Sequence, residues 1–267
     1  MDEKWGFVGK KQKHCGGDGG GDPDGDGRGD GGDARKGDNW DHVAFDPEHR
    51  LVLSAVPGKR TAERVGELVA DVKKRLGGGG GEHGRVPRLV TTDEYAPYKQ
   101  AVLDAWGVDV TPPRTGKPGR PKKPRREPHP DLCYATVHKT REKGRVVAVT
   151  TALVFGTAAM LAAALAASAC STHVNTSFVE RHNGTDRNRN ARKVRKTYCF
   201  SKDWDTHEAV GYFTMYGYNF CWPVRTLAAK REDGTKAPRT PAMAAGLADH
   251  VWTLAEWLAF PAIRHSA

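Results

Sequence analysis

The chain has 267 residues, a formal net charge of +10 and a hydrophobic fraction of 38%. That fraction is low for one compact domain of this length, so part of the chain is expected to lie in loops. The basic character is typical of proteins that contact phosphate groups, although an ordinary basic protein can carry the same charge. The five cysteines form no CxxC pair, which argues against a disulfide framework or a zinc knuckle and favours a reducing cytoplasm.

Three short strands are predicted near the N-terminus. Residues 3–9, 42–45 and 50–56 are rich in apolar and β-branched side chains, and the turn-prone DPEH separates the second segment from the third. We therefore expect three consecutive antiparallel strands.

Residues 15–39, between the first two of these strands, consist mostly of Gly and Asp. The spacing of five of them matches a calcium-binding EF-hand loop: Asp22, Asp24, Asp26, Gly27 and Asp33. However, Asp33 stands where such loops carry a bidentate Glu, and no helix can be drawn on either side. The preferred interpretation is a flexible, disordered insertion that joins two strands of a hairpin.

A helix, a strand and a second helix are predicted next. Thr61 can cap a helix whose apolar residues recur at helical spacing up to Leu76, where a run of glycines ends it. The segment VPRLVTTD reads as a short buried strand ending at Asp93, and EYAPYKQAVLDAW resumes helical character.

Residues 111–130 are rich in Pro, Lys and Arg, which excludes a helix and predicts an extended arm. PGRPKKPRR (118–126) resembles an AT-hook, with Arg120 in a narrow minor groove and phosphate contacts from Lys122, Lys123, Arg125 and Arg126. Because Pro/Lys/Arg linkers are common, non-specific phosphate binding is the safer interpretation.

No residue from Val146 to Cys170 is charged, so this stretch could be read as a membrane span. The preferred interpretation is a buried strand over VVAVTTALVF, followed by a buried Ala-rich helix that Thr157 caps. Exposure of these apolar residues would count against it. A basic helix over Arg181–Lys196, with Glu180 at its start, and helices over 207–220 and 243–258 are also predicted.

Three acids suit two-metal phosphoryl transfer, because magnesium prefers oxygen ligands and carboxylates distant in sequence can converge on it. Asp2 lies beside the first strand, Asp93 ends a later strand and Glu180 begins a helix. Taken singly, these acids are weak signals in a chain with 32 Asp and Glu.

Several motifs add a resemblance to the insertion-sequence-one family of bacterial DDE transposases. They are DEKWGFVGKK, GKRTAE, TTDEYAPY, NTSFVERHNGTDRNRNARKVRKTYCFSK and YNFCWPVRTL, which together span roughly residues 2–227. The resemblance implies a ribonuclease-H-like α/β fold, a mixed sheet flanked by helices. It also implies that Asp2, Asp93 and Glu180 are the catalytic and metal-binding acids, with Mg²⁺ as the metal and Mn²⁺ as a substitute.

The same resemblance implies the partners. Family members cut double-stranded DNA at terminal inverted repeats and join the freed 3′ hydroxyl to target DNA, so a homo-oligomer is expected and a membrane is not. Asn183 belongs to the matching C-terminal signature, and Arg187, Arg192 and Arg195 are candidate phosphate contacts, the alternative being a solvated charged face.

Family members carry a DNA-binding region before the first acid, whereas Asp2 directly follows Met1 in this chain. The sequence therefore suggests an N-terminally truncated copy whose first strand could fray and whose activity could be weakened or lost. We expect a catalytic domain over 1–227 and a linker with a helical tail over 228–267. The alternatives are a DNA-binding remnant without catalysis, a ribonuclease-H-like nuclease that acts on RNA/DNA hybrids or junctions, and a membrane-associated protein.

Overall fold

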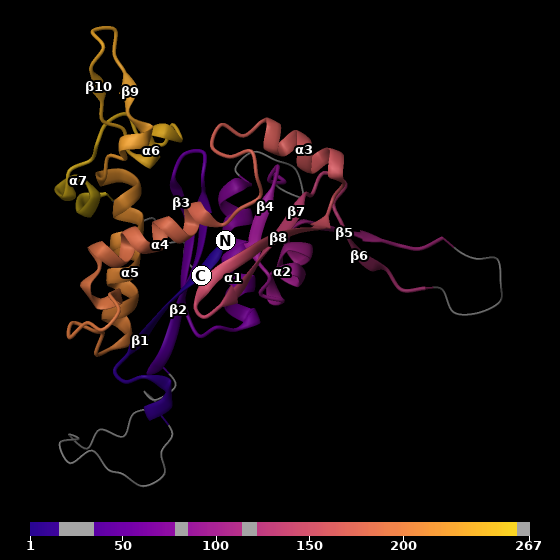
Figure 1. Cartoon of the computed structure of the whole chain (residues 1–267), viewed down its shortest axis with the longest axis horizontal. Coiled ribbons are helices and arrows are strands. Elements are labelled where there is room, and N and C mark those ends of the chain that lie inside the picture. The colour runs from indigo at the N-terminus through magenta and orange to yellow at the C-terminus, as the bar shows by residue number, and fades with distance from the viewer. Residues whose placement is uncertain (16–34, 78–84, 114–121, 261–267) are drawn as a thin grey trace.

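The computed structural model describes residues 1–15, 35–77, 85–113 and 122–260, and it shows a mixed α/β protein (Figure 1). The strands are β1 (Asp2–Val8), β2 (Gly37–Asp46), β3 (Leu51–Gly58), β4 (Val90–Asp93), β5 (Gly107–Val110), β6 (Arg125–Pro128), β7 (Tyr134–Glu142), β8 (Arg145–Phe155), β9 (Ala229–Lys230) and β10 (Lys236–Ala237). The α-helices are α1 (Ala62–Leu76), α2 (Pro97–Trp106), α3 (Ala158–Ala166), α4 (Ser177–Arg189), α5 (Trp204–Cys221), α6 (Pro241–Ala244) and α7 (Leu254–Ala259).

Strands β1, β2 and β3 form an antiparallel sheet in that order, as the sequence predicted. Trp5 lies opposite Trp40, and His42 lies opposite Val56. The Gly/Asp-rich insertion does connect two strands of a hairpin, but Gly37–Asn39 at its end belong to β2. Residues 16–34, which include the calcium-loop match, lie outside the described residues.

A second three-stranded sheet has the order β4-β7-β8, with β4 parallel to β7 and β7 antiparallel to β8. Lys143 and Gly144 have φ values of 45° and 80°, which suit the tight turn between β7 and β8. The two sheets meet where the Met1 ammonium donates a hydrogen bond of 2.6 Å to the Thr91 carbonyl oxygen. The beginning of β1 is thus attached to β4, although fraying was expected there.

Helices cover both faces of the first sheet. Neighbouring residues of a strand point to opposite faces, so each strand contributes side chains to two cores. Ala44 joins a core formed with α1, α2 and the second sheet, whereas the adjacent Val43 joins a core formed with α4 and α5. The first core contains Ala44, Val65, Leu68, Val69, Val72, Val90, Tyr98, Ala101, Val102, Ala105, Trp106, Leu132 and Tyr134. The second contains Val43, Val52, Ala55, Val179, Met215 and Tyr218.

The predicted helix caps are present. Thr61 Oγ1 accepts a hydrogen bond of 3.4 Å from the Arg64 amide, and Thr157 Oγ1 accepts one of 3.2 Å from the Met160 amide. A capping hydroxyl satisfies an amide that has no partner within its helix, which explains why α1 and α3 begin where they do.

Four buried charged side chains lie between the first sheet and α4. Lys4 on β1 contacts both Asp186 on α4 and Asp41 on β2, the latter at 3.2 Å. Lys193 Nζ lies 2.6 Å from the same Asp41 carboxylate. Two positive and two negative charges thus balance each other away from water. Burial alone would raise the pKa of Asp41, but the ammonium groups of Lys193 and Lys4 hold it well below its usual range.

The prediction of a buried strand and a buried helix over residues 146–170 was half right. The strand and helix are present as β8 and α3, but Arg145–Leu153 are exposed and α3 has no buried residue. The reason is that β8 is an edge strand, and no other described strand pairs with its outer side. Among the described helices, none is long and apolar enough to cross a membrane.

One predicted helix ends earlier than expected, and another is interrupted. The basic helix α4 stops at Arg189, because Asn190 turns the backbone out of the helix and its side chain accepts a hydrogen bond from the Arg192 amide. The predicted helix over 243–258 is split into α6 and α7. Gly246, between them, has a φ of 72°, which is incompatible with an α-helix.

The arm over 111–130 is extended, as predicted, where it is described. Its final part forms β6, which pairs with β5 in a ribbon that projects from the body of the molecule (Figure 1). Residues 114–121 lie outside the described part of the chain. Helices α6 and α7 pack beside α5, and the β9–β10 hairpin projects beyond α6 (Figure 1). The Trp252 amide donates a hydrogen bond of 3.1 Å to the Phe220 carbonyl oxygen. All five cysteines are free thiols.

Candidate active site

The three acids singled out in the sequence line one cavity of about 530 Å³. Asp2 comes from the start of β1, Asp93 from the end of β4 and Glu180 from the first turn of α4. The cavity lies at the junction of the two sheets, under the end of the parallel pair β4 and β7. Asp2 and Asp93 are 91 residues apart in the chain (93 − 2), and Asp93 and Glu180 are 87 residues apart (180 − 93). The fold brings all three to the same cavity.

Asp2 is held by α4. Its Oδ2 accepts a hydrogen bond of 2.8 Å from the Asn183 side-chain amide. Burial raises the pKa of Asp2, and the nearby carboxylates of Asp93 and Glu180 raise it further, although the Met1 ammonium opposes them. The carboxylates of Asp93 and Glu180 are thus close enough to disfavour the charge of Asp2, an effect that a cation in the cavity would relieve.

Glu180 is already paired. Its Oε1 accepts hydrogen bonds from Lys139 Nζ and, at 2.6 Å, from Thr176 Oγ1. Partial burial raises the pKa of Glu180, but these two hydrogen bonds outweigh that effect and lower it overall. Lys139 therefore keeps the carboxylate ionised and occupies one of the oxygens that a metal ion would need.

Asp93, at the end of β4, contacts the Tyr95 amide and Arg60, which precedes α1. Its Oδ1 accepts a hydrogen bond of 3.2 Å from the Tyr95 amide, and its Oδ2 lies 3.9 Å from Arg60 Nη2. The same guanidinium pairs with Glu3 at 3.0 Å. Arg60 thus lies between two carboxylates of the cavity wall.

The donor types suit a hard divalent ion, because carboxylate and amide oxygens are the ligands that Mg²⁺ prefers. The Asn183 Oδ1 atom is buried without a hydrogen-bond partner and belongs to the same cavity wall. Within the described ranges, however, no three His, Cys, Asp or Glu side chains gather closely enough to hold a metal ion. The residues fit the ion in chemistry, and the three acids would have to draw together to bind it.

Basic side chains share the cavity wall with the acids. Arg187 and Arg195, two of the predicted phosphate contacts, line it together with Lys139 and Arg141 of β7. Arg187 is partly buried and donates a weak hydrogen bond of 3.4 Å to the Trp5 carbonyl oxygen, whereas Arg195 is exposed. Anionic groups entering the cavity would meet these cations beside the carboxylates.

The remaining candidate DNA contacts lie elsewhere. Arg192 follows α4 and is not part of the cavity wall, and Arg120 lies outside the described residues. Lys122 and Lys123 are exposed at the start of the described part of the arm. Arg125 pairs with Glu127 on the same strand at 2.5 Å.

Arg126 is engaged by the protein itself. Its guanidinium donates a hydrogen bond of 2.9 Å to the Asp104 carbonyl oxygen at the end of α2 and lies 3.1 Å from the Asp109 carboxylate. A cation at that position satisfies a carbonyl that the helix leaves without a partner. Arg126 therefore has a structural contact that the sequence analysis did not foresee.

Sequence reasoning also missed Lys139 and Arg141. These residues lie two positions apart on β7, so they project from the same face of the strand and both reach the cavity. The signal was available in the sequence, since Val137, Lys139 and Arg141 alternate with His138 and Thr140. The alternation alone could not show that these side chains face the acids. That follows from the parallel pairing of β7 with β4, in which Val137 lies opposite Asp93.

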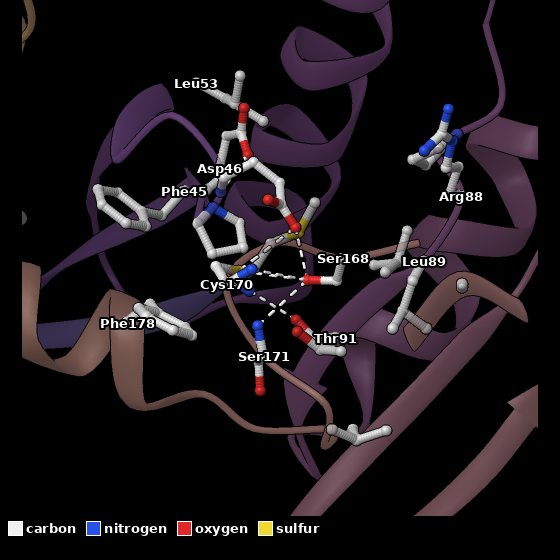
Figure 2. A pocket seen from close by; sticks show the side chains of 18 of the residues that line it. Phe45, Asp46, Leu53, Arg88, Leu89, Thr91, Ser168, Cys170, Ser171 and Phe178 are labelled. Atoms are coloured by element: carbon white, nitrogen blue, oxygen red, sulfur yellow. Dashed lines mark hydrogen bonds between the residues drawn. The ribbon is translucent and has the colours of Figure 1, made fainter. Parts of the chain in front are cut away.

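A second cavity, of about 470 Å³, lies between the β2–β3 turn, the end of α3 and the start of α4 (Figure 2). Its walls are largely apolar, with Phe45, Leu53 and Phe178 among them. The polar groups inside it bond to one another: Ser168 Oγ donates to Glu48 at 2.5 Å, and Cys170 Sγ lies 3.4 Å from the same carboxylate. None of the three predicted acids contributes to it, so it does not compete with the first cavity for the predicted chemistry.

Comparison of the chain with protein-family models, with curated proteins and with solved structures gave no match.

Proposed function

We propose that this chain is a DDE-type transposase that acts on double-stranded DNA in the bacterial cytoplasm, cutting phosphodiester bonds and transferring strands at the ends of a mobile element. The observation that carries the proposal is the convergence of Asp2, Asp93 and Glu180 on one cavity whose wall also contains basic side chains. Acids serve to bind metal and cations to bind phosphate, and the reaction needs both in one place.

The arrangement of elements supports a ribonuclease-H-like fold. An antiparallel meander β1-β2-β3 is followed by α1, by β4 next to the start of β1, and by α2 and a strand parallel to β4. Helices lie on both faces of the meander, and the third acid is on a helix packed against it. In a single mixed sheet flanked by helices, as the resemblance implies, β1-β2-β3 and β4-β7-β8 would lie side by side, and the contact between Met1 and Thr91 supports that arrangement.

Asp2, Asp93 and Glu180 are the side chains that would hold Mg²⁺, with Mn²⁺ as a substitute. When bound, such ions stabilise the attacking and leaving oxygens of an in-line displacement at phosphorus. Asn183 orients the Asp2 carboxylate through its 2.8 Å hydrogen bond, and Thr176 orients Glu180. These two contacts fix the direction of carboxylates that lie on different elements.

The cations of the cavity wall have a separate task. Arg141 and Arg195 would bind the phosphates that flank the cut bond, which places the reacting phosphate over the acids. Lys139 would exchange Glu180 for a DNA phosphate when the carboxylate engages metal. Since the reaction joins two element ends, the active form is expected to be a homo-oligomer bound to terminal inverted repeats and target DNA.

A specific observation favours a second candidate, a DNA-binding remnant without catalysis. No three-ligand cluster is assembled among the described residues, and Glu180 is neutralised by Lys139. Such a protein would keep the basic cavity wall but would not bring two metal ions to a phosphate. The two candidates differ in one measurable property, which is whether DNA is cut.

The test is a cleavage and strand-transfer assay with Mg²⁺ or Mn²⁺ and labelled duplexes covering the DNA that flanks the gene. Asp93→Asn and Glu180→Gln remove predicted metal ligands. Glu94→Gln is the matched control, since Glu94 lines the same cavity but pairs with His138 at 2.6 Å. We expect nicking and strand joining that both ligand variants abolish and the control retains.

The outcomes separate the candidates. If neither wild type nor variants cut DNA but all retard it in a gel, the chain is a binding remnant. If RNA/DNA hybrids are cut and no 3′ end is joined, the chain is a nuclease of the same fold. If Asp93→Asn and Glu180→Gln cut as well as wild type, the three-acid site is not the active site.

A further inference from the structure

The outer edge of β8 is a long strand surface without a partner among the described strands. β8 has eleven residues and stands at the end of the order β4-β7-β8. Alternate residues of an edge strand direct their N–H and C=O groups outward, where they can pair with another strand. Proteins usually blunt such an edge with charged side chains or proline. β8 has neither after Arg145.

Large apolar side chains are exposed along this strand. Val146, Val147, Val149 and Leu153 have exposed fractions between 38% and 56%. Such residues are normally scattered singly over a surface, and a contiguous group of them marks a contact site. Their exposure is therefore unexplained by the fold of a single chain.

Helix α3 extends this surface. All nine of its residues are apolar, yet none is buried. A cavity of about 340 Å³ lies between α3 and the C-terminal half of β8, lined by Ala135, Thr151, Ala152, Leu153, Ala158, Leu161, Ala162 and Leu165. Strand, cavity and helix thus form one apolar surface, which we call the β8–α3 surface (β8 together with Ala158–Ala166).

Its charge sets this surface apart from the rest of the molecule. The chain has a net charge of +10, but no residue between Val146 and Cys170 is charged. DNA is a poor partner here because it requires Lys and Arg. Two copies of such a basic protein repel each other over most of their surface, so a contact between copies is least opposed where charge is absent.

We propose that the β8–α3 surface binds the same surface of a second copy of this chain, with the two β8 strands paired antiparallel about a two-fold axis. The proposal rests on this surface and not on the proposed reaction. An isologous contact of this kind places the same patch on both subunits. It would turn the two edge strands into the centre of one continuous sheet.

The sequence of β8 is complementary to itself in this arrangement. With the axis near Thr150, Val147 lies opposite Leu153 of the second copy, because paired positions sum to 300. Arg145 then lies opposite Phe155, so the one charge of the strand does not lie opposite another cation. Like charges that lie opposite each other destabilise a pair of strands, and this arrangement has none.

The size of the surface is sufficient. Eleven strand residues at about 3.3 Å each give a length of roughly 36 Å. The strand spacing of about 4.8 Å and a helix about 10 Å wide give a width of roughly 15 Å. Two such surfaces cover on the order of 1,000 Å², about the lower limit for a specific protein interface.

A lipid surface would also accept apolar side chains, but it does not suit this one. An open strand edge in hydrocarbon leaves backbone N–H and C=O groups without hydrogen bonds, at several kcal/mol each. A second β8 satisfies those groups. Pairing with a copy therefore covers both the side chains and the backbone.

The experiment measures the mass of the full chain by light scattering and sedimentation, without DNA, over roughly a hundredfold range of concentration. We expect a monomer–dimer equilibrium for wild type. Val149→Lys places two lysines close to the axis and is expected to weaken dimerisation at least about tenfold. Leu258→Lys is the matched control, because Leu258 is 68% exposed on α7, away from this surface, and its variant should dimerise as wild type does.

Hydrogen exchange identifies the contact independently. Backbone amides of β8 are expected to exchange more slowly at high protein concentration in wild type and not in Val149→Lys, while circular dichroism verifies that both are folded. A chain that stays monomeric throughout overturns the proposal, as does a dimer that Val149→Lys leaves intact. Flotation of the wild-type monomer with uncharged phosphatidylcholine vesicles, lost in Val149→Lys, would assign the surface to lipid and also overturn the proposal.

Discussion

Lys4 of β1 forms a buried ion pair with Asp186 of α4, two residues beyond the place where Asp2 of the same strand accepts a hydrogen bond from Asn183 of the same helix. Asp2 and Lys4 share one face of the strand, and Asn183 and Asp186 are one helical turn apart. Two successive contacts therefore set the position of α4 along β1. Because Glu180 lies on α4, this ion pair also sets how far the first acid is from the third.

Removal of Lys4 should destabilise the protein strongly. In Lys4→Met, Lys193 still pairs with Asp41, but the buried carboxylate of Asp186 loses its ammonium partner. We expect a loss of about 3–5 kcal/mol in the free energy of unfolding, measured by urea denaturation. Arg125→Met is the control, since it breaks an exposed pair with Glu127 and should cost less than about 1 kcal/mol. Equal losses in the two variants would contradict the structural role of Lys4.

A buried histidine should make stability fall in weak acid. Burial, with help from Lys193, lowers the pKa of His207 from 6.5 to about 4. Between these values the unfolded chain binds a proton that the folded protein does not, so protonation favours unfolding as pH falls. The loss from pH 7 to pH 4 is at most about 3 kcal/mol.

His207→Gln tests this, because an amide can keep the hydrogen bond with Ser201 Oγ without titrating. Its unfolding free energy, measured by urea denaturation at several pH values, should depend less on pH between about 4 and 6.5 than that of wild type. Hydrogen bonds to Asp249 and Glu256 raise the pKa of His250, so His250→Gln should alter the profile only above that window. An unchanged slope in His207→Gln would refute the assignment.

Two glycine substitutions should have opposite effects. Gly156, between β8 and α3, has a φ of 92°, and an added Cβ would lie 2.9 Å from the Leu132 carbonyl oxygen. Gly156→Ala should therefore destabilise by about 1–3 kcal/mol. Gly66, within α1, has open space where a Cβ would be, so Gly66→Ala should stabilise by about 0.5–1 kcal/mol. Thermal unfolding of both variants measures the difference, and a shift of the same sign in both would contradict it.

Two arginines that the sequence placed together as DNA contacts should behave differently. Arg195 is exposed in the wall of the cavity that holds the three acids. Arg195→Gln should therefore weaken DNA binding and reduce the slope of log affinity against log salt by about 1. Arg126 bonds the end of α2, so Arg126→Gln should cost about 0.5–1.5 kcal/mol of stability and leave the slope unchanged. Fluorescence anisotropy with labelled duplex at several salt concentrations measures the slope. A larger change for Arg126→Gln would reverse the assignment.

Much of the local structure was determined by the sequence alone. Apolar periodicity and the Thr61 cap defined α1, apolar content and the DPEH turn defined the first three strands, and the pattern of Asp93 after a buried run placed it at the end of β4. These features depend on neighbours within a few residues, which is why they can be read without a structure. The sequence also pointed to Asp2, Asp93 and Glu180, although it could not bring them into one cavity.

Only the tertiary structure decided which surfaces are covered. It paired Lys4 with a carboxylate 182 residues away, engaged Glu180 with Lys139, and left β8 and α3 exposed where burial was expected. An apolar run of strand and helix residues is compatible with either outcome, because burial depends on whether a distant segment, or another molecule, lies against it. The composition of the segment itself carries no record of that partner.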